Sequence, residues 1–245
     1  MTIHSPAIAI EDVVFRWKPD QPCLDIPGIN IMAGERLFLH GPSGCGKSTL
    51  LALLAGVLVP QQGDITVLGQ PLASLSASER DRFRVDHIGF VFQQFNVLPY
   101  LSVLENTVLP CRFSRRRAAQ AIVTSGSVGA EAHRLLSRLG LGQALLARPA
   151  AMLSVGQQQR VAAARALMGT PALLIADEPT SSLDAARQLD FLALLQECAA
   201  ASSTLVVVSH DQRLATHFSH TLALPEINRA APGHHDDGPL RCAIW

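Results

Sequence analysis

Residues 36–59 read RLFLHGPSGCGKSTLLALLAGVLV, and this stretch decides the fold class. The run from Arg36 to His40 is short and apolar, as in a buried strand, and it stops at a glycine. The apolar segment that begins near Lys47 has the composition of a helix. A strand, a turn that matches G-x-x-x-x-G-K-[ST] and a helix, in this order, predict a phosphate-binding loop.

The residues of this turn supply the chemistry that a nucleotide phosphate requires. Glycines let backbone N–H groups curl around an anion, and the N-terminus of the following helix is electropositive. Lys47 is one of two lysines in a chain rich in arginine, and its ammonium can reach the phosphate oxygens. The Ser48 hydroxyl can hold Mg²⁺. The expected nucleotide ligands are Gly41, Pro42, Ser43, Gly44, Cys45, Gly46, Lys47, Ser48 and Thr49.

A second acidic segment, ALLIADEPT at 172–180, places Asp177 and Glu178 after an apolar strand. Ligands of open α/β sheets bind at the carboxyl ends of the strands. Asp177 is therefore suited to hold Mg²⁺ through water, and Glu178 to polarise a water for attack on a γ-phosphate. The alternative is a plain helix N-terminus with an acidic start, and the phosphate loop in the same chain argues against it.

The rest of the chain alternates between strand and helix patterns. Apolar runs at 172–176 and 205–208 suit central strands of a parallel sheet. Further strands are expected at 7–15, 26–31, 64–68 and 86–92, and helices at 157–168 and 189–201. From Asn96 to Ala150 the pattern is mostly helical, with a loose loop expected near 124–129 that is too short to establish a domain linker.

Composition excludes several classes of protein. Hydrophobic residues make up 48% of the 245, which excludes disorder, and 20 basic residues balance 20 acidic ones, which argues against nucleic-acid binding through bulk charge. The longest apolar run, Leu50 to Val59, has half of the roughly twenty residues that a membrane helix needs. No signal peptide is expected from the first residues. Five cysteines without a CxxC pair indicate reduced thiols in a cytosolic compartment.

Further motifs resemble the nucleotide-binding subunit of ATP-binding cassette (ABC) transporters over nearly the whole chain. The sequence LSVGQ at 153–157, followed by QQRVAAARAL, is similar to the family signature LSGGQ, with Val155 in place of the middle glycine. The resemblance implies contact with ATP bound to the opposite protomer. The residues concerned are Leu153, Ser154, Val155, Gly156 and Gln157.

The remaining motifs follow in the order of the family. Trp17 resembles the aromatic residue that stacks on adenine, and Gln93 the glutamine that senses Mg²⁺ and the γ-phosphate. Asp184, in SSLD, resembles the loop that crosses the dimer interface, and His210 resembles the histidine that contacts the γ-phosphate. The simpler alternatives are a core aromatic for Trp17, a surface amide for Gln93 and a helix cap for His210.

The resemblance implies one α/β domain: a P-loop NTPase parallel-sheet core with an antiparallel β subdomain and an inserted helical subdomain. The core would cover about 1–92 and 159–225, the helical subdomain about 93–158, and an irregular tail 226–245. The segment VFQQFNVLPYLSVLENTVLP, from Val91 to Pro110, is most similar to the lipoprotein-release and macrolide-export branch.

The implied activity is ATP hydrolysis with Mg²⁺ by a head-to-tail homodimer, with no nucleic-acid partner. The homodimer would be peripheral, bound to a membrane permease at the cytoplasmic face of the inner membrane, for export or for lipoprotein or lipid extraction. The permease would dock near Gln93 to Tyr100, on Phe95, Val97, Leu98 and Tyr100. Two alternatives are a soluble ABC ATPase of DNA repair or translation and a catalytically inactive regulatory module.

Three smaller features carry expectations of their own. The oriented N–H groups of the phosphate loop would favour a thiolate at Cys45, and nucleotide would protect it from alkylation. Arg115 to Arg117 is expected to be a solvated helix face, with a lipid-headgroup contact as the alternative. His234 to Asp237 is expected to lie in a solvated tail, with metal binding as the alternative.

Overall fold

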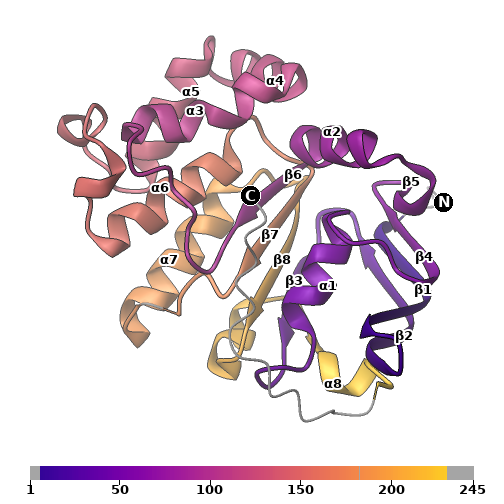
Figure 1. Ribbon diagram of the computed structural model, residues 1–245. Helices are drawn as coiled ribbons and strands as arrows, with labels where there is room; N and C mark the ends of the chain where they lie inside the picture. Colours follow the sequence, from indigo (N-terminus) through magenta and orange to yellow (C-terminus); the bar gives the residue numbers. More distant parts are fainter. Residues whose placement is uncertain (1–5, 182, 231–245) are drawn as a thin grey trace.

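The computed structural model describes residues 6–181 and 183–230, which form two β-sheets and a set of helices (Figure 1). The larger sheet is parallel, with strand order β6-β7-β8-β3-β9. Its strands are β3 (Arg36–His40), β6 (Ile88–Val91), β7 (Leu173–Asp177), β8 (Thr204–Ser209) and β9 (His220–Ala223). The apolar runs at 172–176 and 205–208 therefore form adjacent central strands, as expected.

The two faces of the parallel sheet bury different parts of the chain. Leu174 and Val207 point to the side where the core is built from helices. Leu173 and Val206 point to the side that holds the helix after the phosphate loop and the second sheet. All four are fully buried, because a parallel strand covered on both faces leaves no side for water.

The smaller sheet is antiparallel, with order β2-β1-β4-β5. Its strands are β1 (Pro6–Lys18), β2 (Gln21–Met32), β4 (Gln62–Val67) and β5 (Gln70–Pro71). The structure thus contains the parallel core, the antiparallel sheet and the helical insertion that the family resemblance implies. In Figure 1 the antiparallel sheet and the inserted helices lie on opposite sides of the parallel sheet.

Eight α-helices and four short 3₁₀ helices occur in the described part of the chain. None of these helices is long and apolar enough to cross a membrane. The α-helices are α1 (Lys47–Leu54), α2 (Ala77–His87), α3 (Val103–Phe113), α4 (Arg115–Ser125), α5 (Val128–Arg138), α6 (Val155–Leu167), α7 (Ala185–Cys198) and α8 (Leu224–Ile227). The 3₁₀ helices are η1 (Leu72–Ser74), η2 (Gln143–Leu145), η3 (Ala150–Met152) and η4 (Gln212–His217).

Several expected boundaries were wrong. Asp86 and His87 end helix α2 and do not belong to strand β6. The loop expected at 124–129 is only a short junction between α4 and α5, because Gly126 ends α4 in a left-handed conformation and Ser127 caps α5. Glu226 and Ile227, expected in an irregular tail, belong to α8. His234 to Asp237 lie outside the described residues.

The prediction that Arg115 to Arg117 form a solvated helix face is wrong for Arg117. Arg115 and Arg116 are exposed, but Arg117 is only 3% exposed. Its guanidinium donates to the carbonyls of Met168 at 2.7 Å, Ala166 at 2.5 Å and Ile88 at 3.4 Å. Burial lowers the pKa of Arg117 to about 10. This side chain therefore fastens the inserted helices to the core.

Candidate nucleotide-hydrolysis site

The phosphate loop runs from the end of β3 to the start of α1, as the motif predicts. Gly46 precedes α1 with φ +99°, a left-handed conformation that favours glycine. A Cβ at this position would also lie 2.6 Å from Cδ2 of Leu24. Glycine is therefore required here both by the backbone conformation and by close packing on strand β2.

Lys47 is 7% exposed, although it is a lysine at the start of a helix. Its Nζ donates to the carbonyl oxygens of Gly41 at 2.9 Å and Pro42 at 2.8 Å. Those contacts hold the ammonium within the loop and leave it one further hydrogen to donate. The loop thus presents a positive charge where a phosphate would approach the N-terminus of α1.

A hydrogen bond between Ser48 and Asp177 joins the phosphate loop to the acidic segment that follows β7. The Ser48 Oγ donates to Asp177 Oδ2 at 3.1 Å, across 129 residues of sequence. Burial raises the pKa of Asp177, an effect opposed by the Ser48 hydrogen bond and by Lys47. A hydroxyl and a buried carboxylate are hard oxygen ligands, so this pair fits Mg²⁺.

Glu178 and His210 form the second half of the site. Glu178 follows β7 with φ +42°, and its N–H donates to the Val208 carbonyl at 2.9 Å. A non-glycine residue in this conformation is strained, and such strain clusters at functional sites. The Glu178 Oε2 lies 3.1 Å from Nδ1 of His210, whose side chain is largely exposed. The imidazole therefore fixes the direction of the carboxylate.

Trp17 and Gln93 flank this cluster. The Trp17 ring is 48% exposed, packs edge-on against Phe15 at 5.0 Å and donates from Nε1 to Thr49 Oγ1 at 3.3 Å. Trp17 therefore lies beside α1 with much of its surface open to solvent. Gln93 is exposed and follows β6, which pairs in parallel with β7, so it lies at the same sheet edge as Asp177.

The signature residues occupy a different part of the surface. Ser154 caps α6, with its Oγ accepting from the Gln157 N–H at 3.4 Å and its own N–H donating to Gln157 Oε1 at 3.0 Å. This reciprocal cap starts the helix at Val155, earlier than expected. Val155 is 55% exposed, whereas Leu153 is buried. No hydrogen bond in the described residues joins 153–157 to the phosphate loop.

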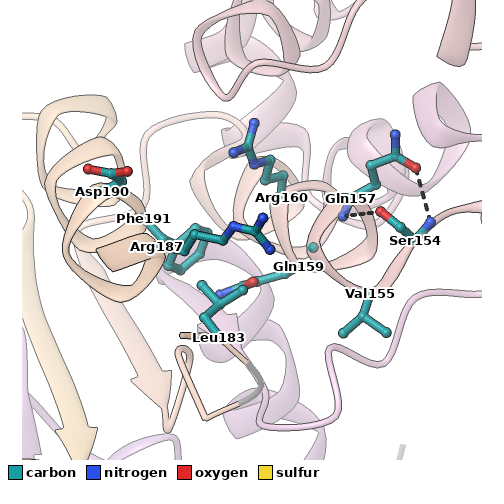
Figure 2. A pocket seen from close by; sticks show the side chains of 10 residues that line it. Ser154, Val155, Gln157, Gln159, Arg160, Leu183, Arg187, Asp190 and Phe191 are labelled. Carbon is teal, nitrogen blue, oxygen red and sulfur yellow. Dashed lines mark hydrogen bonds between the residues drawn. The ribbon is translucent and has the colours of Figure 1, made fainter. Parts of the chain in front are cut away.

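A groove of about 630 Å³ separates the starts of α6 and α7 (Figure 2). In Figure 2 the paired Ser154 and Gln157 lie at one end, and Arg187 and Asp190 of α7 approach the other. Asp184 caps α7, accepting from the Arg187 N–H at 3.0 Å. The signature and the Asp184 loop are thus neighbours on one exposed face.

Only part of the expected permease-docking segment, Gln93 to Tyr100, is exposed at the surface. Phe95 is 6% exposed and packs in the core, so it was wrongly included as a docking residue. Val97 and Leu98 are half-buried, and Tyr100 is 75% exposed. Met152, which the sequence analysis missed, is 70% exposed on the segment hydrogen-bonded to 99–101.

Two side chains that the sequence analysis also missed shape this segment. Asn106 is buried and bonds both the N–H and the carbonyl of Leu98, at 2.8 and 3.0 Å. The Arg165 guanidinium donates to the carbonyls of Phe95 and Asn96, each at 2.7 Å. Asn106 and Arg165 both bond to backbone atoms of an irregular segment. Contacts of this kind do not depend on the side chains of that segment, so the sequence carries no pattern that reveals them.

Cys45 does not match its expected thiolate character. Burial raises the pKa of the Cys45 thiol, and this outweighs the opposing effects of Lys47 and the backbone N–H groups. A Cβ on Gly41 would lie 2.7 Å from the Cys45 sulfur, so the thiol packs against the loop backbone. The loop therefore holds a neutral thiol at neutral pH.

Together, these residues define a class of protein. A phosphate loop with a buried lysine, a hydroxyl–carboxylate pair and a histidine-oriented glutamate meet at the carboxyl edge of a parallel sheet. This is the arrangement of a P-loop nucleoside-triphosphate hydrolase.

Comparison with known proteins identifies the family within that class. A family model described as "ABC transporter" matches residues 24–181. The "Lipoprotein-releasing system ATP-binding protein LolD" of Anaeromyxobacter dehalogenans is 41% identical over 215 residues, 87% of each chain. YbbA of Escherichia coli, an "Uncharacterized ABC transporter ATP-binding protein", is 43% identical over 79% of this chain and 82% of its own. The chain belongs to the ABC transporter family.

Two further matches concern a solved structure and a longer relative that this chain covers only in part. The ATP-binding cassette MJ0796, solved as a dimer in a post-hydrolysis state with ADP and Pi, has a TM-score of 0.76 and 32% identity, covering 88% of this chain and 93% of that one. The "Macrolide export ATP-binding/permease protein MacB" of Burkholderia pseudomallei is 39% identical over 85% of this chain. The chain spans about a third of the length of such MacB relatives.

Proposed function

We propose that this chain binds and hydrolyses ATP as the ATP-binding subunit of an ABC transporter. The observation that carries the proposal is the convergence of Lys47, Ser48, Asp177, Glu178 and His210, drawn from three separate segments, at one sheet edge. The presence of both Lys47 and Glu178 in this arrangement favours an active ATPase over an inactive regulatory module.

Each residue has a role that follows from its contacts. Lys47 and the loop N–H groups bind the phosphates; Ser48 and Asp177 would hold Mg²⁺, which would supply positive charge against the phosphates. Glu178 accepts a proton from the attacking water, and the 3.1 Å contact with His210 keeps its carboxylate directed. Paired with an ionised Glu178, the Nδ1 of His210 carries the hydrogen.

A second copy of the chain would complete the nucleotide site. Ser154 to Gln157 share an exposed face with Asp184, and within the described residues they make no hydrogen bond to the phosphate loop of their own chain. The dimeric structures of the related cassette support a homodimer, in which a two-fold axis generates two equivalent sites. ATP then favours the closed dimer, because it adds contacts only there, and hydrolysis reopens it.

The transport role rests on the relatives and on one exposed patch. Names of relatives include lipoprotein release and macrolide export, so we propose export or lipoprotein or lipid extraction at the cytoplasmic face of the inner membrane. Residues 93–158 would form the helical subdomain that meets a membrane permease. Gln93 to Tyr100 is the docking segment; Tyr100 is exposed within it, and Met152 is exposed on the neighbouring segment.

A comparison of ATPase rates and dimerisation tests this function. Glu178→Gln is expected to lower phosphate release from ATP by about 10²–10⁴-fold, the contribution of a positioned general base. Sedimentation velocity should still detect a dimer that ATP stabilises. Glu197→Gln, at an exposed glutamate of α7, is the matched control and should keep the wild-type rate. A wild-type rate for Glu178→Gln would remove Glu178 from its role, and a wild-type chain that binds no ATP would refute the function.

A further inference from the structure

The chain after β9 packs against the phosphate loop. Leu224, at the start of α8, is fully buried. The ring of Pro225 approaches Gly41 so closely that a Cβ there would lie 3.1 Å from the proline Cδ. The last described segment of the chain is therefore in direct contact with the start of the loop.

Asn228, the residue after α8, uses every hydrogen-bonding group of its side chain. Its Oδ1 accepts from the N–H groups of Asp25 at 2.8 Å and Ala230 at 3.1 Å. Its Nδ2 donates to the carbonyls of Cys23 at 3.1 Å and Cys45 at 3.4 Å. The reverse amide orientation would point an oxygen at two carbonyls, so the network itself fixes the side chain.

The bond to Cys45 controls the direction of a loop peptide. A trans peptide is planar, so its N–H points away from its C=O. With the Cys45 carbonyl turned toward Asn228, the N–H of Gly46 points to the opposite side. Lys47 holds two earlier carbonyls of the loop, but it does not hold this one.

We propose that Asn228 is a positioning residue for the phosphate loop. It anchors the Cys45–Gly46 peptide to strand β2 through Cys23 and Asp25, and so presets an N–H donor for the phosphates of a nucleotide. This inference rests on the proposed nucleotide binding. The side chain does not touch the nucleotide, and it acts through the loop backbone.

Calorimetric titration of the 245-residue chain with ADP and Mg²⁺ tests the proposal, because ADP needs no second protomer for its diphosphate. Asn228→Asp keeps the acceptor bonds to Asp25 and Ala230 but loses both donor bonds, whereas Asn228→Ala loses all four. Each variant is expected to weaken ADP binding about three- to tenfold, the ratio that the loss of one net hydrogen bond gives. Glu226→Gln, at an exposed residue of α8, is the matched control and should bind ADP as the wild type does.

The outcomes separate positioning from a merely structural role. Weakened ADP binding by Asn228→Asp with an unchanged melting temperature supports positioning. Wild-type affinity in Asn228→Asp, equal weakening by Glu226→Gln, or loss of folding in both Asn228 variants would overturn it. A wild-type chain that binds no ADP would overturn the proposed function together with this inference.

Discussion

Replacement of Arg117 by methionine tests how the inserted helices are fastened to the core. Methionine has a similar length but no donor, so Arg117→Met leaves the carbonyls of Met168 and Ala166 without their short bonds. Hydrogen bonds to a charged group contribute about 1.5–3 kcal/mol each, which gives about 3–6 kcal/mol for the two.

Desolvation of the guanidinium opposes this gain. Burial lowers the pKa of Arg117 to about 10, which shows that its charged form is disfavoured in the fold. The lower end of the range, about 3 kcal/mol, is therefore the expected loss in the free energy of unfolding. For a chain of this size that corresponds to a fall of about 6–12 °C in melting temperature.

Thermal unfolding followed by circular dichroism measures the effect of Arg117→Met. Arg116→Met is the matched control, because Arg116 is the exposed neighbour on the same helix, and its change should stay within about 0.5 kcal/mol. A melting temperature for Arg117→Met within about 2 °C of wild type, or an equal fall for Arg116→Met, would refute the reasoning.

Three other substitutions have expected outcomes. Burial raises the pKa of Asp177 above 3.8, so the folded protein keeps the proton to higher pH than the unfolded chain, and stability falls as pH rises from 3.8 through the raised value. Asp177→Asn should remove this fall in stability with rising pH, as measured by melting curves of the nucleotide-free protein at several pH values. The same variant should bind Mg²⁺-ATP more weakly. An unchanged dependence of the melting temperature on pH would contradict the raised pKa of Asp177. Val155→Gly should strengthen ATP-dependent dimerisation severalfold in sedimentation equilibrium, because it removes an exposed β-branched side chain from the signature, and weaker association would contradict a steric role. Gly169→Ala should lower the melting temperature, because its φ is +69° and a Cβ would lie 2.4 Å from the Arg117 carbonyl; a stable variant would show that the backbone there is free to shift.

Local motifs could be predicted from the sequence because consecutive residues determine them. The strand, glycine turn and helix of the phosphate loop lie where the pattern places them. Helix α2 was missed because it has no apolar face, although Ser76 and Glu79 form a reciprocal cap that the sequence displays. A search for capping boxes would have found it.

Features that depend on distant partners could not be predicted. Three consecutive arginines look alike in sequence, and Arg117 differs only because carbonyls 49 and 51 residues further along the chain meet its guanidinium. Phe95 was expected to be a docking residue because it lies in the segment where the family resemblance places the permease. The Phe95 side chain is 6% exposed in the folded chain, and no local pattern records that burial.

The sequence by itself determined that this chain binds phosphate, because the loop from Gly41 to Thr49 carries its own backbone preferences and charge. Tertiary structure decided which groups join that loop. Packing brings Asp177 to Ser48 across 129 residues and Asn228 to Cys45 across 183. Backbone conformation depends on neighbouring residues, but the partner of a side chain depends on which remote segments the two sheets and the helices bring into contact.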